Sequence, residues 1–161
     1  MAYTRKRTAK RTRPKDRTCY ETAVYLLQFR DQSEKDLTRK LREREYTEKE
    51  IEEAMERLRD YEYVNDENLA DELFEAYRRR AQYGDAYIHQ KLKLKGLATE
   101  KHLQLEEEIE MAAALLQKKW GMSPKLRTDF KKSASFLLRR GFSHDAVMTV
   151  MHEMDLEEIE E

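Results

Sequence analysis

Two stretches of this chain, Leu92-Lys93-Leu94-Lys95-Gly96-Leu97 and Leu137-Leu138-Arg139-Arg140-Gly141-Phe142, share one pattern: a leucine, three residues, a glycine and a large apolar residue. A third stretch, Leu41-Arg42-Glu43-Arg44-Glu45-Tyr46, repeats the pattern with a glutamate in the place of the glycine. We call this six-residue pattern the repeat turn; its copies are 51 and 45 residues apart. Repetition at such a period is typical of stacked helical units and predicts a repeat protein.

The glycine of the repeat turn stands where a helix ends. Glycine adopts a left-handed backbone without steric cost, so Gly96 and Gly141 are expected to terminate helices in that conformation. Glu45 at the equivalent position predicts a different or more strained turn. Directly after it, Thr47 and Glu50 have the spacing of a capping box, which predicts the start of the next helix.

The composition predicts an all-α protein. The 161 residues include only 4 glycines and 2 prolines, and 40% of the residues are charged against 39% hydrophobic. These values suit small three-helix units with thin cores. We expect nine helices in three tandem three-helix repeats. The expected organisation is a basic arm (1–17), three repeats (18–63, 65–106 and 107–154) and an acidic tail (155–161).

Within this scheme, local signals mark several helix boundaries. Asn65 or Asp66 is expected to cap the fourth helix. Gly84 and Gly121 are expected to end helices, so that all four glycines fall at helix junctions. Ser123 and Pro124 are expected to open a helix, because proline at the first helical position loses no hydrogen bond.

The net charge of −1 conceals strong segregation along the chain. Residues 1–17 carry eight basic residues and one acid, and the remainder of the chain is correspondingly acidic. A basic arm of this kind either contacts a polyanion or is a solvated tail, and the sequence leaves both readings open.

Charge is also sorted by the position of each expected helix in its repeat. The second helices (33–44, 84–95 and 125–140) have net charges of +2, +2 and +5, whereas the third helices (47–60, 99–110 and 143–161) have −3, −4 and −7. Charged residues can simply cover solvent-exposed faces. Three agreements in three repeats favour a function, because stacked repeats would align the second helices into a basic stripe suited to phosphate groups.

The candidate residues that face a nucleic acid or an acidic protein surface are therefore basic residues of the second helices and a basic cluster before Gly84. They are Arg39, Lys40, Arg78, Arg79, Arg80, Lys91, Lys93, Lys95, Lys131, Lys132, Arg139 and Arg140. Tyr77, Tyr83 and Tyr87 lie near the cluster. They either stack on unpaired bases or belong to the core; we expect Tyr77 to be a core residue, and the other two stay open.

No catalytic constellation, metal site or cofactor site is expected. The chain lacks a phosphate-binding loop and a dinucleotide-binding turn, and its one cysteine, Cys19, has no second cysteine with which to bind a metal. His144 and His152 are spaced to share a helical face, but no further ligand accompanies them. The run Glu106-Glu107-Glu108 is interpreted as solvated charge. Because no apolar run is long enough to cross a bilayer and the N-terminus has no apolar signal core, we expect a cytoplasmic protein without membrane contact. We also expect a monomer.

Read in order, several segments resemble the RecX family, bacterial modulators of the RecA recombinase. The resemblance covers roughly residues 20–153 and is carried by residues 23–37 (AVYLLQFRDQSEKDL), 61–66 (YEYVND), 84–88 (GDAYI), 90–97 (QKLKLKGL) and 136–142 (FLLRRGF). Three positions depart from the family pattern: Glu45 and Glu62 replace common glycines, and Asn65 replaces a common aspartate.

The resemblance implies an elongated, curved array of three three-helix repeats that binds in the groove of the RecA–single-stranded-DNA filament. It implies a mainly inhibitory, non-enzymatic modulator of RecA. Such a protein limits filament growth, ATPase, strand exchange and coprotease activity, and so acts in DNA recombination, repair and the SOS response. The implied partners are RecA and single-stranded DNA, with duplex DNA as a further candidate. Two alternatives remain: a general DNA-binding helical protein, and a helical-repeat adaptor for protein interactions.

Overall fold

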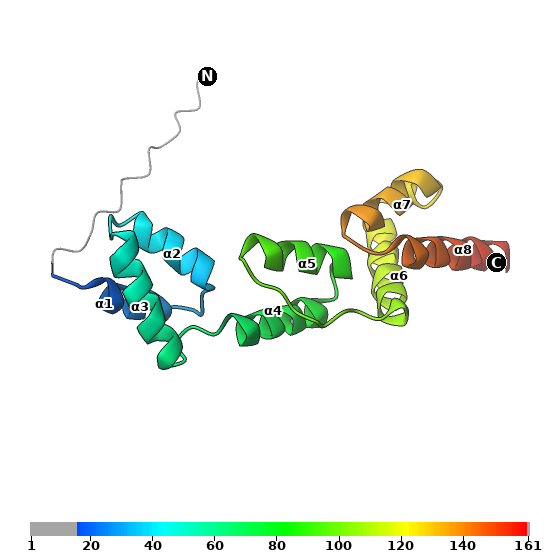
Figure 1. The fold of residues 1–161 in the computed structure, drawn as a ribbon. Helices are drawn as coiled ribbons and strands as arrows, with labels where there is room; N and C mark the ends of the chain where they lie inside the picture. The colour runs from blue at the N-terminus through cyan, green and yellow to red at the C-terminus, as the bar shows by residue number, and fades with distance from the viewer. Residues whose placement is uncertain (1–15, 161) are drawn as a thin grey trace, which may run out of the picture. The chain divides into compact units, whose positions relative to one another are not determined.

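The computed structural model describes residues 16–160, and the side chains among them as far as Met154. This part of the chain holds eight α-helices, one 3-10 helix and no strand (Figure 1). The helices are α1 (Cys19–Leu27), α2 (Glu34–Arg42), α3 (Glu48–Asp60), α4 (Asp66–Arg80), α5 (Asp85–Leu94), α6 (Leu105–Met122), η1 (Pro124–Leu126), α7 (Phe130–Arg139) and α8 (His144–Glu160). The predicted all-α fold class is confirmed.

The chain divides into two compact units, and the boundary between residues 69 and 70 falls inside α4. The first predicted repeat holds α1 to α3, and the third holds most of α6 with α7 and most of α8. The division at residues 64 and 106 and the elongated, curved array stay predictions. Most of the basic arm lies outside the described residues, as do the side chains of the acidic tail.

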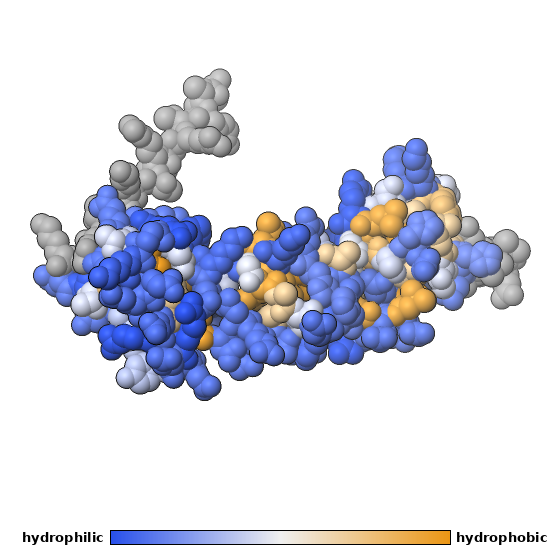
Figure 2. Space-filling model, viewed as in Figure 1, coloured by the Kyte–Doolittle hydropathy of each residue, from blue (hydrophilic) through white to orange (hydrophobic). Residues whose placement is uncertain are grey.

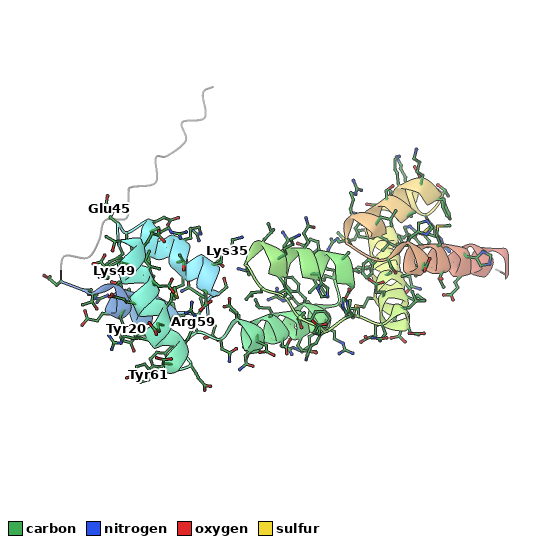
Figure 3. The ribbon with its side chains drawn as sticks, in the orientation of Figure 1. Tyr20, Lys35, Glu45, Lys49, Arg59 and Tyr61 are labelled. Atoms are coloured by element: carbon green, nitrogen blue, oxygen red, sulfur yellow. The ribbon has the colours of Figure 1, made fainter. Side chains whose placement is uncertain are left out.

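In the first unit, α1, α2 and α3 pack around one core that includes Leu37, Leu41 and Leu58. The predicted capping box is confirmed, because the Thr47 side chain accepts the Glu50 N–H and the Glu50 carboxylate accepts the Thr47 N–H. Figure 3 shows Glu45 in the turn before α3 and Lys49 in its first turn.

All three repeat turns have one backbone geometry. Glu45, Gly96 and Gly141 have φ values of 66°, 72° and 82°. In each copy the N–H of the last residue donates to the carbonyl of the leucine five residues earlier, and both of these apolar side chains are buried. The left-handed ends at Gly96 and Gly141 are confirmed. Glu45 makes the same turn in a conformation that costs an L-residue about 1–2 kcal/mol.

A fourth repeat turn ends α3 and escaped the sequence analysis. Leu58 and Tyr63 are its first and last residues, and Glu62 occupies the glycine position with φ of 55°. The Tyr63 N–H donates to the Leu58 carbonyl at 2.9 Å. The pattern is visible in the sequence as leucine, three residues, glutamate and tyrosine, and the first copy shows that glutamate can replace the glycine.

The third helix expected in the second repeat does not form, and that prediction is wrong. Residues 97–104 have no helix, and α6 begins only after Gln104, whose side chain forms a capping box with Glu107. Gly96 ends the preceding turn in the left-handed region, so only seven residues (97–103) remain before the next cap, Gln104. Side chains satisfy part of this backbone instead: the Leu103 N–H donates to Asp85 at 2.8 Å. Four of the five acidic residues assigned to that helix, Glu106, Glu107, Glu108 and Glu110, belong to the first turns of α6, and Glu100 lies in the irregular segment.

Three further boundary predictions need correction. Ala81, not Gly84, takes the left-handed conformation after α4, and Gly84 is the residue before α5. Gly121 lies inside the last turn of α6. Pro124 opens a 3-10 turn, and α7 starts at Phe130 with the Asp129 carboxylate accepting the Lys132 N–H. The backbone hydrogen bond from Lys132 lowers the pKa of Asp129.

In the second unit, α5 meets the turn between α7 and α8 at a close backbone contact. The Gly84 N–H donates to the Arg140 carbonyl at 2.9 Å. A Cβ atom on Gly84 would lie 2.3 Å from the Gly141 oxygen, so only glycine fits there. This contact brings the ends of two predicted second helices, α5 and α7, together.

Among the described residues, no helix combines the length and apolarity needed to cross a bilayer. Figure 2 shows a largely hydrophilic visible surface over α1 to α3, with larger hydrophobic areas over the second unit.

Candidate nucleic-acid interface

A column of alternating aromatic and basic side chains crosses the contact between α5 and α7. Tyr83 and Tyr87 stack with their ring centroids 3.9 Å apart and an interplanar angle of 7°. Lys91 Nζ lies over the Tyr87 ring at 5.1 Å, and Arg140 Cζ lies over the Tyr83 ring at the same distance. Because each tyrosine covers one face of the other, the two cations occupy the outer faces. Cation–π attraction stabilises this arrangement.

The column continues beyond Arg140 onto α7 and α6. Arg140 Cζ also lies 5.3 Å from the Phe136 ring centroid, and Lys119 Nζ lies 5.5 Å from it. We call these residues the cation–aromatic column: Lys91, Tyr87, Tyr83, Arg140, Phe136 and Lys119. A hollow of about 210 Å³ lies beside it, lined by Gln82, Leu115, Lys118, Lys119, Met122, Phe136 and Arg140.

The cation–aromatic column shows how Tyr83 and Tyr87, which the sequence assigns either to base stacking or to the core, are placed. Tyr83 and Tyr87 are half-buried, and their ring faces are occupied by each other and by the protein's own cations. A nucleic-acid base would have to displace Lys91 or Arg140 to stack on them. Tyr77 contacts both rings edge-on and is half-buried, less than its predicted place in the core suggests.

The structure separates the members of the basic cluster at the end of α4. Arg78 is bound to the Glu107 carboxylate, with Nε 2.8 Å from Oε1, and is therefore engaged within the protein. This hydrogen bond raises the pKa of Arg78. Arg79 and Arg80 are exposed and are available to a phosphate or to an acidic protein surface.

The two candidates on α2 also make internal contacts. Arg39 Nη1 lies 2.6 Å from the Glu43 carboxylate one turn later. Lys40 donates to the Gln32 side chain, and its pKa is lowered, first by desolvation and then by the positive charge of Arg30. Arg39 remains exposed, whereas Lys40 is half-buried and serves the packing of the first unit.

On α5 and α7 the candidates differ in exposure. Lys93, Lys131 and Arg139 are exposed, and Lys132 is exposed but paired with Asp129 at 3.0 Å. Lys91 and Lys95 are half-buried. The second unit thus brings together Lys91 and Arg140 through the column. The alignment of the second helices of all three repeats into one basic stripe stays a prediction.

The acidic run 106–108 is not simple solvated charge, so that interpretation was wrong. Glu108 is buried, and its carboxylate accepts the Asp85 N–H at 2.9 Å and the Ser143 N–H at 3.3 Å. It therefore caps the N-terminal ends of α5 and α8 together. Glu107 accepts the Gln104 N–H, which lowers its pKa, and it also binds Arg78. Only Glu106 is exposed.

One group of side chains in the described residues has the composition of a metal site. Asp85, His89 and His102 place one potential ligand atom each within 4.8 Å of the others. The group cannot be recognised from the sequence, because His102 is distant along the chain from Asp85 and lies in the segment 97–104, where a helix is predicted.

The fold and this interface define an all-α protein of small helical units that presents exposed basic side chains on its second helices. Exposed cations of this kind suit contacts with an anionic macromolecule.

Comparison with known proteins identifies the family. Residues 19–58 match the family model for the first three-helix domain of RecX, and residues 106–151 match the model for the third. Regulatory protein RecX of Actinobacillus pleuropneumoniae serotype 5b is 34% identical over 140 residues, covering 80% of this chain and 87% of the relative. That of Haemophilus ducreyi is 31% identical over 150 residues, covering 88% and 94%.

A solved structure agrees with the sequence relatives. The crystal structure of RecX from Lactobacillus salivarius superposes with a TM-score of 0.74 at 26% identity, covering 86% of this chain and 95% of that chain. The chain belongs to the RecX family, a family of regulatory proteins that are not enzymes.

Proposed function

We propose that this protein modulates the RecA recombinase, mainly as an inhibitor, by binding in the groove of the RecA–single-stranded-DNA filament. In this proposal it limits filament growth, and with it ATPase, strand exchange and coprotease activity. The observation that carries the proposal is family membership, which rests on matches near both ends of the helical region and on relatives aligned over most of the chain.

The charge distribution supports this mode of binding. Lys93, Lys131 and Arg139 on α5 and α7 are exposed, as are Arg79 and Arg80 at the end of α4. Exposed cations of this kind neutralise phosphates and release their counterions, or pair with acidic groups of a recombinase. When several repeats each contact the filament, the later contacts are intramolecular, and multivalency raises the overall affinity.

RecA ATPase on single-stranded DNA, titrated with the full chain, tests the proposal. We expect the rate to fall as the protein is added, because incomplete filaments hydrolyse less ATP. An unchanged ATPase rate at several-fold excess of this protein over RecA would show that it does not inhibit RecA. We also infer that the protein is cytoplasmic and monomeric; size-exclusion chromatography with light scattering checks the monomeric state.

A double variant tests which surface binds. Replacing Lys131 and Arg139 with alanine removes two exposed charges from α7 and should weaken filament binding and its dependence on salt. Arg30→Ala/Lys49→Ala is the matched control, since it removes two exposed charges outside the candidate residues. Equal affinity of both double variants would exclude α7 from the interface.

A further inference from the structure

Three side chains with metal-binding donors meet where α5 begins. Asp85 is the first residue of α5, His89 lies one turn later, and His102 comes from the irregular segment 97–104. His102 Nδ1 is 2.8 Å from Asp85 Oδ2, and His89 Nε2 is 3.6 Å from Asp85 Oδ1. The two imidazole rings stack with centroids 4.4 Å apart. The three donors therefore already face one small volume.

The separations are close to those around a bound cation. With zinc–nitrogen distances of about 2.0–2.1 Å, the donor atoms of a tetrahedral site lie roughly 3.3 Å apart. The three atoms here lie within 4.8 Å of one another. Shifts of about 1 Å would bring them into range. His102 can supply such a shift, because its side chain is 58% exposed and its segment has no regular structure.

Neighbouring groups orient the carboxylate. Asp85 Oδ1 accepts the Leu103 N–H at 2.8 Å, and the buried Glu108 accepts the Asp85 N–H at 2.9 Å. Hydrogen bonds of this kind hold metal ligands in position and raise affinity. His89 Nε2 is 2.9 Å from the Lys101 carbonyl oxygen, so binding through this atom would replace that hydrogen bond with a metal–nitrogen bond.

We propose that Asp85, His89 and His102 bind a first-row divalent cation of the zinc type, leaving further coordination positions for water. Two imidazoles and one carboxylate form a donor set that binds zinc-type cations in preference to magnesium or calcium. The bound cation fastens the irregular segment 97–104 to α5. This site goes beyond the RecA-modulating function and does not depend on it.

Calorimetric titration of the full chain with Zn²⁺, using protein without a histidine tag, tests the site. We expect one saturable equivalent, and at 100-fold excess over Kd a rise in Tm of about 5 °C. His102→Ala and His89→Ala should each weaken binding at least tenfold. His144→Ala, on the exposed start of α8, is the matched control and should bind as the parent does.

Cobalt absorption gives an independent readout. Co²⁺ in the site should produce visible bands that are absent in His102→Ala and present in His144→Ala. Absence of saturable Zn²⁺ binding, or binding unaltered in both His89→Ala and His102→Ala, would overturn the proposal. If His89→Ala loses helical circular dichroism without metal, His102→Ala decides, because His102 lies outside the helices.

Discussion

At the scale of single residues, a left-handed backbone position follows five of the described helices: α2, α3, α4, α5 and α7. Glu45, Glu62 and Ala81 occupy such positions without being glycine, whereas Gly96 and Gly141 occupy them at no steric cost. Each non-glycine residue there stores strain of about 1–2 kcal/mol. At Glu45 and Glu62 the strain is tolerated because the N–H of the next residue donates to the leucine carbonyl at the start of the turn.

Replacing Glu45 with glycine should therefore stabilise the protein. The relief of strain exceeds the larger conformational entropy that glycine loses on folding, and we expect the free energy of unfolding to rise by about 0.5–1 kcal/mol. Urea denaturation followed by circular dichroism measures this change. Gly96→Ala is the converse control and should lower stability by about 1 kcal/mol. A loss of stability in Glu45→Gly would show that the glutamate side chain has a stabilising role.

Glu108 is the second residue on which local stability depends. Alanine at this position leaves the N–H groups of Asp85 and Ser143 without their acceptor. We expect Glu108→Ala to cost about 3 kcal/mol, because hydrogen bonds to a charged group are strong and unsatisfied buried donors are costly. The exposed Glu106→Ala, measured in the same denaturation series, should change stability by less than about 0.5 kcal/mol. Equal losses of stability in Glu108→Ala and Glu106→Ala would contradict the role of Glu108 as a cap of both α5 and α8.

At the scale of helices and turns, the packing of α5 against the turn after α7 organises the second unit. Gly84 and Gly141 allow this approach: a Cβ on Gly141 would lie 2.5 Å from the Tyr87 side chain. The contact places Tyr83 and Tyr87 against Arg140 and so assembles the cation–aromatic column. Gly84 and Gly141 are therefore needed both for the packing of α5 and for the assembly of the candidate interface.

Gly84→Ala tests this contact. Its Cβ would meet the backbone of Gly141 and Phe142 at 2.3 Å, so α5 must move, and we expect a loss of about 2–3 kcal/mol. Gly121→Ala is the matched control, because nothing lies within 4 Å of its Cβ and it sits inside α6. Alanine there should stabilise the protein by up to about 1 kcal/mol. Comparable stabilities of the two variants would contradict the close packing.

Features that depend on residues close together in the sequence can be predicted from it, whereas features that depend on tertiary contacts cannot. The repeat turns and the Thr47 capping box were predictable because they depend on residues within six positions of each other. Gly84 was misassigned because its role comes from a contact with Arg140 and Gly141, far along the chain. Glu108 looked like part of a charged run because burial depends on tertiary packing. The missing helix at 97–104 follows from the early cap at Gln104.

At the scale of the whole molecule, a member of a regulatory family carries exposed positive charge on α5 and α7. The exposed cations of α5 and α7 lie on predicted second helices, and two of the four acidic residues of α6, Glu107 and Glu108, make caps and the Arg78 contact within the fold. Positive side chains thus remain available for a partner, although the chain as a whole has a net charge of −1. We expect binding to an anionic filament to weaken as salt rises.

Co-sedimentation of the full chain with preformed RecA filaments on single-stranded DNA distinguishes filament binding from general DNA binding. We expect the protein to pellet with the filaments in a saturable manner, and much less with DNA alone. Protein that stays in the supernatant at several-fold excess of filament, or that pellets equally with naked DNA, would exclude specific binding to the RecA filament.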